Sequence, residues 1–182
     1  MTSLVRIGTH VLAWLALGSH IVFVALLIIA LVSLQQRERM MRVFGTHAVS
    51  LSFIVALVAT LGSLFYSDIA GFEPCKLCWY QRIVMYPQVI LFGVALWKRR
   101  NDLADYSLAL SGIGALIAGY HYLLQRGVVS AAPCSAVGYS VSCSKVFTMS
   151  FGYITIPLMA FTAFALLFAL QMVNKRHKEG LQ

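Results

Sequence analysis

The chain has 182 residues, of which 60% are hydrophobic and only 11% are charged. Soluble domains are about 45–50% apolar and about 25% charged, so this composition excludes an ordinary soluble protein and points to a membrane protein. The net charge of +8 does not indicate a nucleic-acid-binding protein, because the basic residues lie in short clusters between apolar runs instead of one patch.

The first apolar run covers residues 10–34 and contains no charged residue. It exceeds the roughly 20 residues that a helix needs to cross a bilayer. A cleaved signal peptide has an apolar core of about 7–15 residues and a small-residue cleavage site, and no such site precedes Gln35, so we expect a retained span. His20 lies within it. A contact with a neighbouring helix is its simplest interpretation, and a haem or quinone role is the alternative.

Four further apolar runs follow, and polar segments separate them. They predict spans at residues 47–66, 79–97, 103–125 and 151–172, with a basic loop at 35–46 and a basic turn at 98–102. The segments 67–78 and 126–150 are expected to be loops at the opposite ends of these spans. The sequence therefore predicts an all-α, polytopic membrane helical bundle with five spans.

Positive charge is distributed unequally between the two ends of the predicted spans. The 35–46 loop, the 98–102 turn and the C-terminal tail hold nine Lys and Arg residues, whereas the segments at the other ends hold four. Cytoplasmic segments carry the excess of Lys and Arg. We therefore expect an external N-terminus, a cytoplasmic C-terminus and all four cysteines on the extracytoplasmic side.

Two of the cysteines, Cys75 and Cys78, form a Cys-x-x-Cys pair where a polar loop enters the third span. A thiol of such a pair is more readily ionised at a helix N-terminus or beside a cation. If a helix begins near Leu77, Cys78 and Arg82 are four residues apart on one face. The guanidinium then lies beside the sulfur that it helps to ionise, which favours redox chemistry.

The other two cysteines are Cys134 and Cys143, in the longest loop. Disulfides persist outside the bacterial membrane, so two structural disulfides in a non-enzymatic membrane protein remain an alternative. The small loop between Cys75 and Cys78 weakens that alternative, because it constrains an unfolded chain little. A zinc site from four cysteines also remains open, although the spacing of the second pair departs from the usual Cys-x2-4-Cys. We find no flavin, metal or nucleotide motif.

Four motifs occur together in this chain. They are Pro-Cys-x-x-Cys-Trp-Tyr-Gln-Arg at 74–82, Tyr-His-Tyr at 120–122, the second cysteine pair, and Ile-Thr-Ile-Pro at 154–157. In this combination, over roughly residues 47–172, the chain resembles the DsbB family of bacterial membrane thiol oxidases, particularly its short Gram-positive-type members. The related vitamin K epoxide reductases are a further alternative, but their loop cysteines precede the Cys-x-x-Cys.

The resemblance implies a DsbB-like four-helix redox domain at residues 47–182. Residues 1–46 would be an extra N-terminal transmembrane helix with its basic cytoplasmic loop, which departs from the four spans common in the family. A second departure is the short segment between Cys134 and Cys143.

The resemblance also implies an activity, that of a protein-dithiol:quinone oxidoreductase in the bacterial cytoplasmic membrane that supports disulfide bond formation. A reduced DsbA-like thioredoxin-fold partner would attack the Cys134–Cys143 disulfide and form a mixed disulfide with Cys134. The Cys143 thiolate would then attack Cys75 and free Cys78. Each exchange requires a thiolate that attacks a disulfide sulfur.

The last electron acceptor implied by the resemblance is a membrane quinone, either ubiquinone or menaquinone. Cys78 would donate to it, and Arg82 would stabilise the thiolate or a quinone oxygen. His121 is expected near the quinone ring. The alternative for His121 is a histidine at a helix end in the membrane interface.

Overall fold

The computed structural model describes residues 3–32, 34–99, 102–129 and 142–179, with side chains described outside residues 26–41. These residues form five α-helices and one π-helical turn, which are α1 (Ser3–Val32), α2 (Leu34–Leu64), η1 (Phe65–Ile69), α3 (Lys76–Trp97), α4 (Ala104–Gln125) and α5 (Ile156–Glu179). The described residues contain no β-strand, only an isolated bridge between Ser150 and Ile154. The predicted all-α fold is confirmed.

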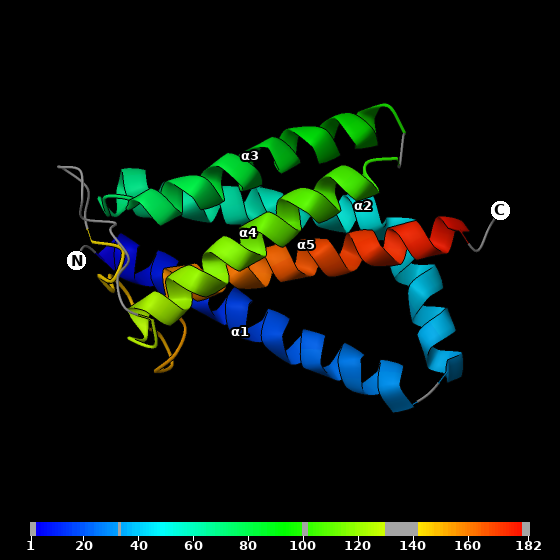
Figure 1. Ribbon diagram of the computed structural model, residues 1–182, viewed down its shortest axis with the longest axis horizontal. Coiled ribbons are helices and arrows are strands. Elements are labelled where there is room, and N and C mark those ends of the chain that lie inside the picture. The colour runs from blue at the N-terminus through cyan, green and yellow to red at the C-terminus, as the bar shows by residue number, and fades with distance from the viewer. Residues whose placement is uncertain (1–2, 33, 100–101, 130–141, 180–182) are drawn as a thin grey trace.

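Helices α2 to α5 form a four-helix bundle (Figure 1). α2 packs against α3 and α5, and α4 packs against the same two helices, so the four helices surround one core. α1 crosses this bundle obliquely and packs against α2 and α5. The bundle thus has one additional helix on its outside, on the side formed by α2 and α5.

Small and polar residues hold the bundle together. Gly114 of α4 lies against the fully buried ring of Phe164 of α5, where a Cβ atom on the glycine would approach the ring to 2.3 Å. In α3, the buried amide oxygen of Gln88 accepts hydrogen bonds from the hydroxyls of Ser107 at 2.8 Å and Ser111 at 3.0 Å on α4. Close approach at small residues and hydrogen bonds between helices are the usual means by which membrane helices associate.

Four segments of the described chain are long and apolar enough to cross a membrane, Ser3–Ala25, Arg42–Ile69, Ala104–Gln125 and Ile156–Glu179. α3 is as long as α4 at 22 residues, but Gln81, Arg82 and Gln88 make it less apolar. It lies side by side with α2 and α4 in the bundle (Figure 1). Its position beside two apolar helices supports the span predicted at residues 79–97.

Two of the predicted boundaries are wrong. The basic segment 35–46 is not a loop, because α2 is helical from Leu34 onward. Figure 1 shows the first part of α2 running at an angle to the rest of that helix. The last helix begins at Ile156 and not at Phe151. Phe151 and Gly152 have φ angles of 53° and 75°, which turn the chain before the helix starts.

The two ends of the bundle differ in what they carry. The start of α1, the start of α3 and the segment that precedes α5 lie at one end, whereas the end of α3, the start of α4 and the end of α5 lie at the other (Figure 1). The Cys-x-x-Cys pair and the segment that contains Cys143 therefore share an end of the molecule (Figure 1).

Candidate active site

Cys75 and Cys78 lie where α3 begins. Cys75 is the N-cap residue of α3, and Cys78 lies in the first turn, where the backbone N–H of Trp79 donates to the Cys75 carbonyl at 3.1 Å. Both cysteines are free thiols, and their Sγ atoms lie 3.2 Å apart. The partial positive charge at a helix N-terminus favours a thiolate in this first turn.

The pKa values of the two thiols shift in opposite directions. The hydrogen bond that the Cys75 thiol donates to Cys78, together with burial, raises the pKa of Cys75 to about 12. The same hydrogen bond lowers the pKa of Cys78 against the opposing effect of burial, and a backbone hydrogen bond from Cys75 and the charge of Arg82 lower it further. In the reduced pair, Cys78 is therefore the thiol that ionises first.

Arg82 lies one turn after Cys78 and reaches across to α2. Its Nε donates to the hydroxyl of Ser63 at 3.0 Å, and its Nη2 donates to the Ser63 carbonyl at 3.0 Å. The hydroxyl of Tyr86 donates to the same Ser63 hydroxyl at 3.3 Å, and the guanidinium lies 5.4 Å from the ring centroid of Trp79. These contacts fix a positive charge beside the Cys78 sulfur.

The third described cysteine, Cys143, is packed against this pair. Its exposed fraction is 1%, and it forms one buried cluster with Cys75 and Leu124, against which Cys78 also packs. The loop is held over the end of α4 by the side-chain amide of Gln125, which donates to the Lys145 carbonyl at 3.0 Å. Two sulfurs that are 68 residues apart in the chain are thus brought into one cluster.

His121, near the end of α4, connects these groups and is 1% exposed. Its Nε2 lies 3.0 Å from the Cys143 carbonyl oxygen and 3.7 Å from the Cys75 sulfur, and its Nδ1 lies 3.1 Å from the amide nitrogen of Gln81. A carbonyl oxygen only accepts and an amide NH₂ only donates. In this pattern Nε2 therefore carries a proton, Nδ1 accepts from Gln81, and His121 holds the Cys143 backbone beside Cys75.

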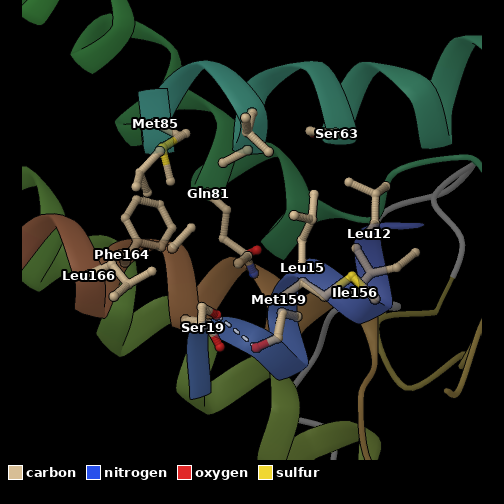
Figure 2. A pocket seen from close by; sticks show the side chains of 18 of the residues that line it. Leu12, Leu15, Ser19, Ser63, Gln81, Met85, Ile156, Met159, Phe164 and Leu166 are labelled. Carbon is tan, nitrogen blue, oxygen red and sulfur yellow. Dashed lines mark hydrogen bonds between the residues drawn. The ribbon is translucent and has the colours of Figure 1, made fainter. Parts of the chain in front are cut away.

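A cavity of about 290 Å³ opens on the other side of Cys78. Residues from α1, α2, α3 and α5 line it, most of them apolar, and Cys78, Gln81 and Arg82 contribute polar atoms to its wall. Figure 2 shows Gln81 and Met85 of α3 facing this space together with Leu15 of α1. An apolar cavity with a few polar groups is the usual form of a small-molecule site, and its volume is close to the lower limit of about 300 Å³ for such sites.

The thiol of Cys78 links the two regions. It lines the large cavity, and it also lines a second cavity of about 20 Å³ beside Cys75, His121 and Gln125. His121 is absent from the lining of the large cavity. Its described contacts place it on the Cys75 and Cys143 side of the site, so its expected contact with a quinone ring stays a prediction.

Of the six residues predicted for the site, the structure gathers Cys75, Cys78, Cys143, Arg82 and His121 at one end of the bundle. Cys134 lies outside the described residues.

The sequence profile of the family described as "Disulfide bond formation protein DsbB" matches residues 45–174. The chain belongs to the DsbB family. A "Probable disulfide formation protein" of Oceanobacillus iheyensis is 42% identical over 128 residues, which are 70% of this chain and 88% of that protein. The "Disulfide bond formation protein C" of Bacillus subtilis is 43% identical over 129 residues, 70% of this chain and 91% of that protein. No solved structure is significantly similar to the chain.

Membership of the DsbB family makes the chain a helical membrane oxidoreductase of disulfide bond formation. The predicted resemblance is confirmed. The profile begins within α2, so α1 lies outside the part of the chain that it matches.

Two residues of this DsbB-family site were not predicted from the sequence, Gln81 and Ser63. Gln81 is 7% exposed and binds His121. It is a polar residue inside a predicted span and three residues after Cys78, which is a usable signal because polar groups in membrane helices tend to be functional. Ser63 is one of several serines near the end of α2 and carries no such signal, because its role depends on contact with Arg82.

The same site of this DsbB-family chain also brings together ligand atoms suited to a metal. The sulfurs of Cys75 and Cys78 and a ring nitrogen of His121 all lie within 4.8 Å of one another. Structural zinc sites take four ligands, and these residues supply three. A metal bound to both thiolates would also prevent the two cysteines from forming a disulfide.

Proposed function

We propose that the chain is a membrane thiol oxidase that reoxidises an extracytoplasmic DsbA-like thioredoxin-fold protein and passes the electrons to a membrane quinone. The observation that carries this proposal is the position of Cys78, which is packed with Cys75 and Cys143 on one side and lines the apolar cavity on the other. A thiol in that position has access both to disulfide exchange and to a lipid-soluble acceptor.

The thiol exchange is assigned to the chain's own cysteines. A partner thiolate attacks Cys134 of the Cys134–Cys143 disulfide, and Cys143 leaves as a thiolate. That thiolate attacks Cys75 of the Cys75–Cys78 disulfide, forms a bond between Cys143 and Cys75, and releases Cys78 as a thiolate. Each step breaks one S–S bond and forms one, as thiol–disulfide exchange requires. The packing of Cys143 against Cys75 supports this order.

The release of Cys78, and not Cys75, is supported by the environment of the pair. The thiol with the lower pKa is the better leaving group in disulfide exchange. Arg82 and the start of α3 favour a thiolate at Cys78, whose pKa is lowered, whereas the pKa of Cys75 is raised to about 12. The negative charge that exchange creates therefore forms at the cavity wall.

The residues around the cavity fit a quinone. Apolar side chains of four helices surround it, and the guanidinium of Arg82, which binds Ser63, offers further N–H donors of the kind that a carbonyl oxygen accepts. A bound quinone supplies a two-electron acceptor that is soluble in the bilayer. The proposal covers both ubiquinone and menaquinone, whose rings present the same pair of carbonyl oxygens.

We further propose that the site faces the extracytoplasmic side of the bacterial cytoplasmic membrane, in a multi-pass chain. The excess of Lys and Arg at the opposite end of the predicted spans supports this orientation. The shared end of the described cysteines is consistent with it (Figure 1). A soluble partner on that side can reach the 126–150 loop without crossing the bilayer.

Turnover tests the proposal directly. The purified chain, mixed with a reduced DsbA-like thioredoxin-fold protein and a short-chain quinone, is expected to reduce one quinone for each partner disulfide formed, over many cycles. Ultraviolet absorption measures the quinone, and thiol alkylation measures the partner. A partner with alkylated thiols is the control and should give no reduction. Stable cysteine disulfides in the chain without any quinone reduction would instead indicate a non-enzymatic protein with structural disulfides.

A further inference from the structure

We propose that α1, which lies outside the part of the chain matched by the family profile, forms one wall of the quinone cavity and contributes to quinone binding. The inference rests on the proposed function, since it assigns a role to α1 in that same site. Four residues of α1 line the cavity, Leu12, Leu15, Ala16 and Ser19. Figure 2 shows Leu12, Leu15 and Ser19 facing the cavity together with residues of α2, α3 and α5.

On one side, α1 is packed closely against α2 and η1. A Cβ atom on Gly8 would lie 2.3 Å from the ring of Phe65, so the ring occupies the space that a side chain on α1 would need. Similarly, a Cβ atom on Gly62 of α2 would lie 3.2 Å from a methyl group of Leu12. Contacts at glycines bring helices close together in membranes, and these two contacts fix α1 next to the cavity.

On the other side, α1 is bonded to α5 and to the turn before it. Nε2 of His20 lies 2.6 Å from the hydroxyl of Thr162. That hydroxyl donates its own proton to the Leu158 carbonyl at 2.9 Å, so it accepts from His20. The rings of Trp14 and Phe151 meet edge to face with centroids 4.9 Å apart. Held at both α2 and α5, α1 spans the cavity between them.

The surface that α1 presents to the cavity is apolar. Leu12, Leu15 and Ala16 contribute only hydrocarbon, and the Ser19 hydroxyl is turned to its own helix, where it donates to the Ala16 carbonyl at 2.7 Å. Cys78 and Arg82, the groups proposed to act on the quinone, come from α3 and not from α1. α1 therefore closes one side of the cavity and separates a bound quinone ring from lipid on that side. It also limits the space that is available to substituents on the ring.

The first test fills the cavity from α1. Ala16→Phe places a ring in the cavity, whereas Val22→Phe adds the same ring at an exposed position of α1 that does not line it. Ala16→Phe is expected to weaken quinone binding by about tenfold or more, and Val22→Phe by less than about twofold. The measurements are the quinone retained per chain after purification and the dissociation constant of a short-chain quinone by equilibrium dialysis.

A second measurement does not depend on how a variant folds. A short-chain quinone that carries a photoreactive group is irradiated with the unmodified chain, and the labelled residues are mapped by mass spectrometry. Labelling within residues 12–19 is expected, in addition to labelling on α2, α3 or α5. Competition by excess unmodified quinone distinguishes site labelling from labelling through the lipid phase.

The outcomes separate this inference from the proposed function. If the unmodified chain retains quinone, but α1 is not labelled and Ala16→Phe binds as Val22→Phe does, the role of α1 is overturned and the thiol oxidase remains. If the unmodified chain neither retains quinone nor is labelled competitively on any helix, both proposals are overturned. Thiol exchange with the reduced partner, measured without quinone, should be the same in both variants.

Discussion

Cys78→Ala is expected to abolish quinone reduction, with a loss on the order of a thousandfold or more, since removal of a reacting group has effects of at least this size. Cys78 is the described cysteine that lines the apolar cavity, and no neighbouring thiol takes its place, because Cys75 lies outside the cavity lining. The measurement is steady-state quinone reduction with a reduced DsbA-like partner.

Cys78→Ala should still accept one pair of electrons from the partner, because the substitution leaves both cysteines of the proposed Cys134–Cys143 disulfide in place. Ile83→Ala is the matched control, as Ile83 lies on the same helix with an exposed fraction of 62% and is expected to change the rate by less than about twofold. Substantial quinone reduction by Cys78→Ala, with the partner as electron source, would show that another group donates to quinone.

Arg82→Ala is expected to decrease quinone reduction by about a hundredfold, the usual effect of removing a charged or hydrogen-bonding group beside developing charge. Arg82 lines the cavity and its positive charge lowers the pKa of Cys78. The described hydrogen bonds of Arg82 go to Ser63 and not to Cys143, so the proposed exchange between the partner and a Cys134–Cys143 disulfide should change by less than about threefold. Quenched-flow trapping of mixed disulfides, without quinone, measures that exchange.

Arg82→Lys and Ser63→Ala are graded controls for the same position. Lysine keeps the charge but lacks the planar fork that binds both the Ser63 hydroxyl and its carbonyl, so a smaller loss is expected. Ser63→Ala keeps the charge and removes one of its two anchors. Equal losses in thiol exchange and in quinone reduction for Arg82→Ala would contradict a role on the quinone side and point to a folding defect.

The start of α3 could be predicted well from the sequence because its signals are local. A helix that begins beside a Cys-x-x-Cys pair places Cys78 and Arg82 on one face whatever surrounds them, and α3 begins at Lys76 with Cys75 as its N-cap. The apolar runs likewise indicate the helices of the bundle, since the bilayer sets their minimum length.

The helix boundaries predicted from hydropathy agree less well with the structure. The segment 35–46 is polar, but Gln, Arg, Glu and Met are strong helix formers, so α2 starts at Leu34 and includes the whole polar segment. Residues 151–155 are apolar, but Phe151 and Gly152 have positive φ angles, and the helix starts only at Ile156. Hydropathy reports the membrane environment of a residue and not its backbone conformation.

The contacts between helices could not be predicted from the sequence. Gln81, His121 and the Cys143 carbonyl meet because α3 and α4 present particular faces to each other and the loop returns over them. The position of α1 against the cavity depends on contacts such as Gly8 with Phe65, more than 50 residues apart. Neither relation follows from periodicity or spacing along one helix.

The most direct test of the central claim is the visible absorption spectrum of purified Cys75→Ser reconstituted with quinone. This variant leaves Cys78 without a disulfide partner, and the serine hydroxyl retains a hydrogen-bond donor in place of the Cys75 thiol. A thiolate in contact with a quinone ring is an electron donor beside an acceptor and gives a charge-transfer band. We predict that Cys75→Ser is coloured and that its band disappears as the pH falls and Cys78 becomes protonated. In Cys75→Ala the band should disappear at a higher pH, because that variant lacks the hydrogen-bond donor that most lowers the pKa of Cys78. Cys78→Ala should remain colourless at every pH, and a band in Cys78→Ala with none in Cys75→Ser would contradict the assignment of Cys78 as the residue in contact with quinone.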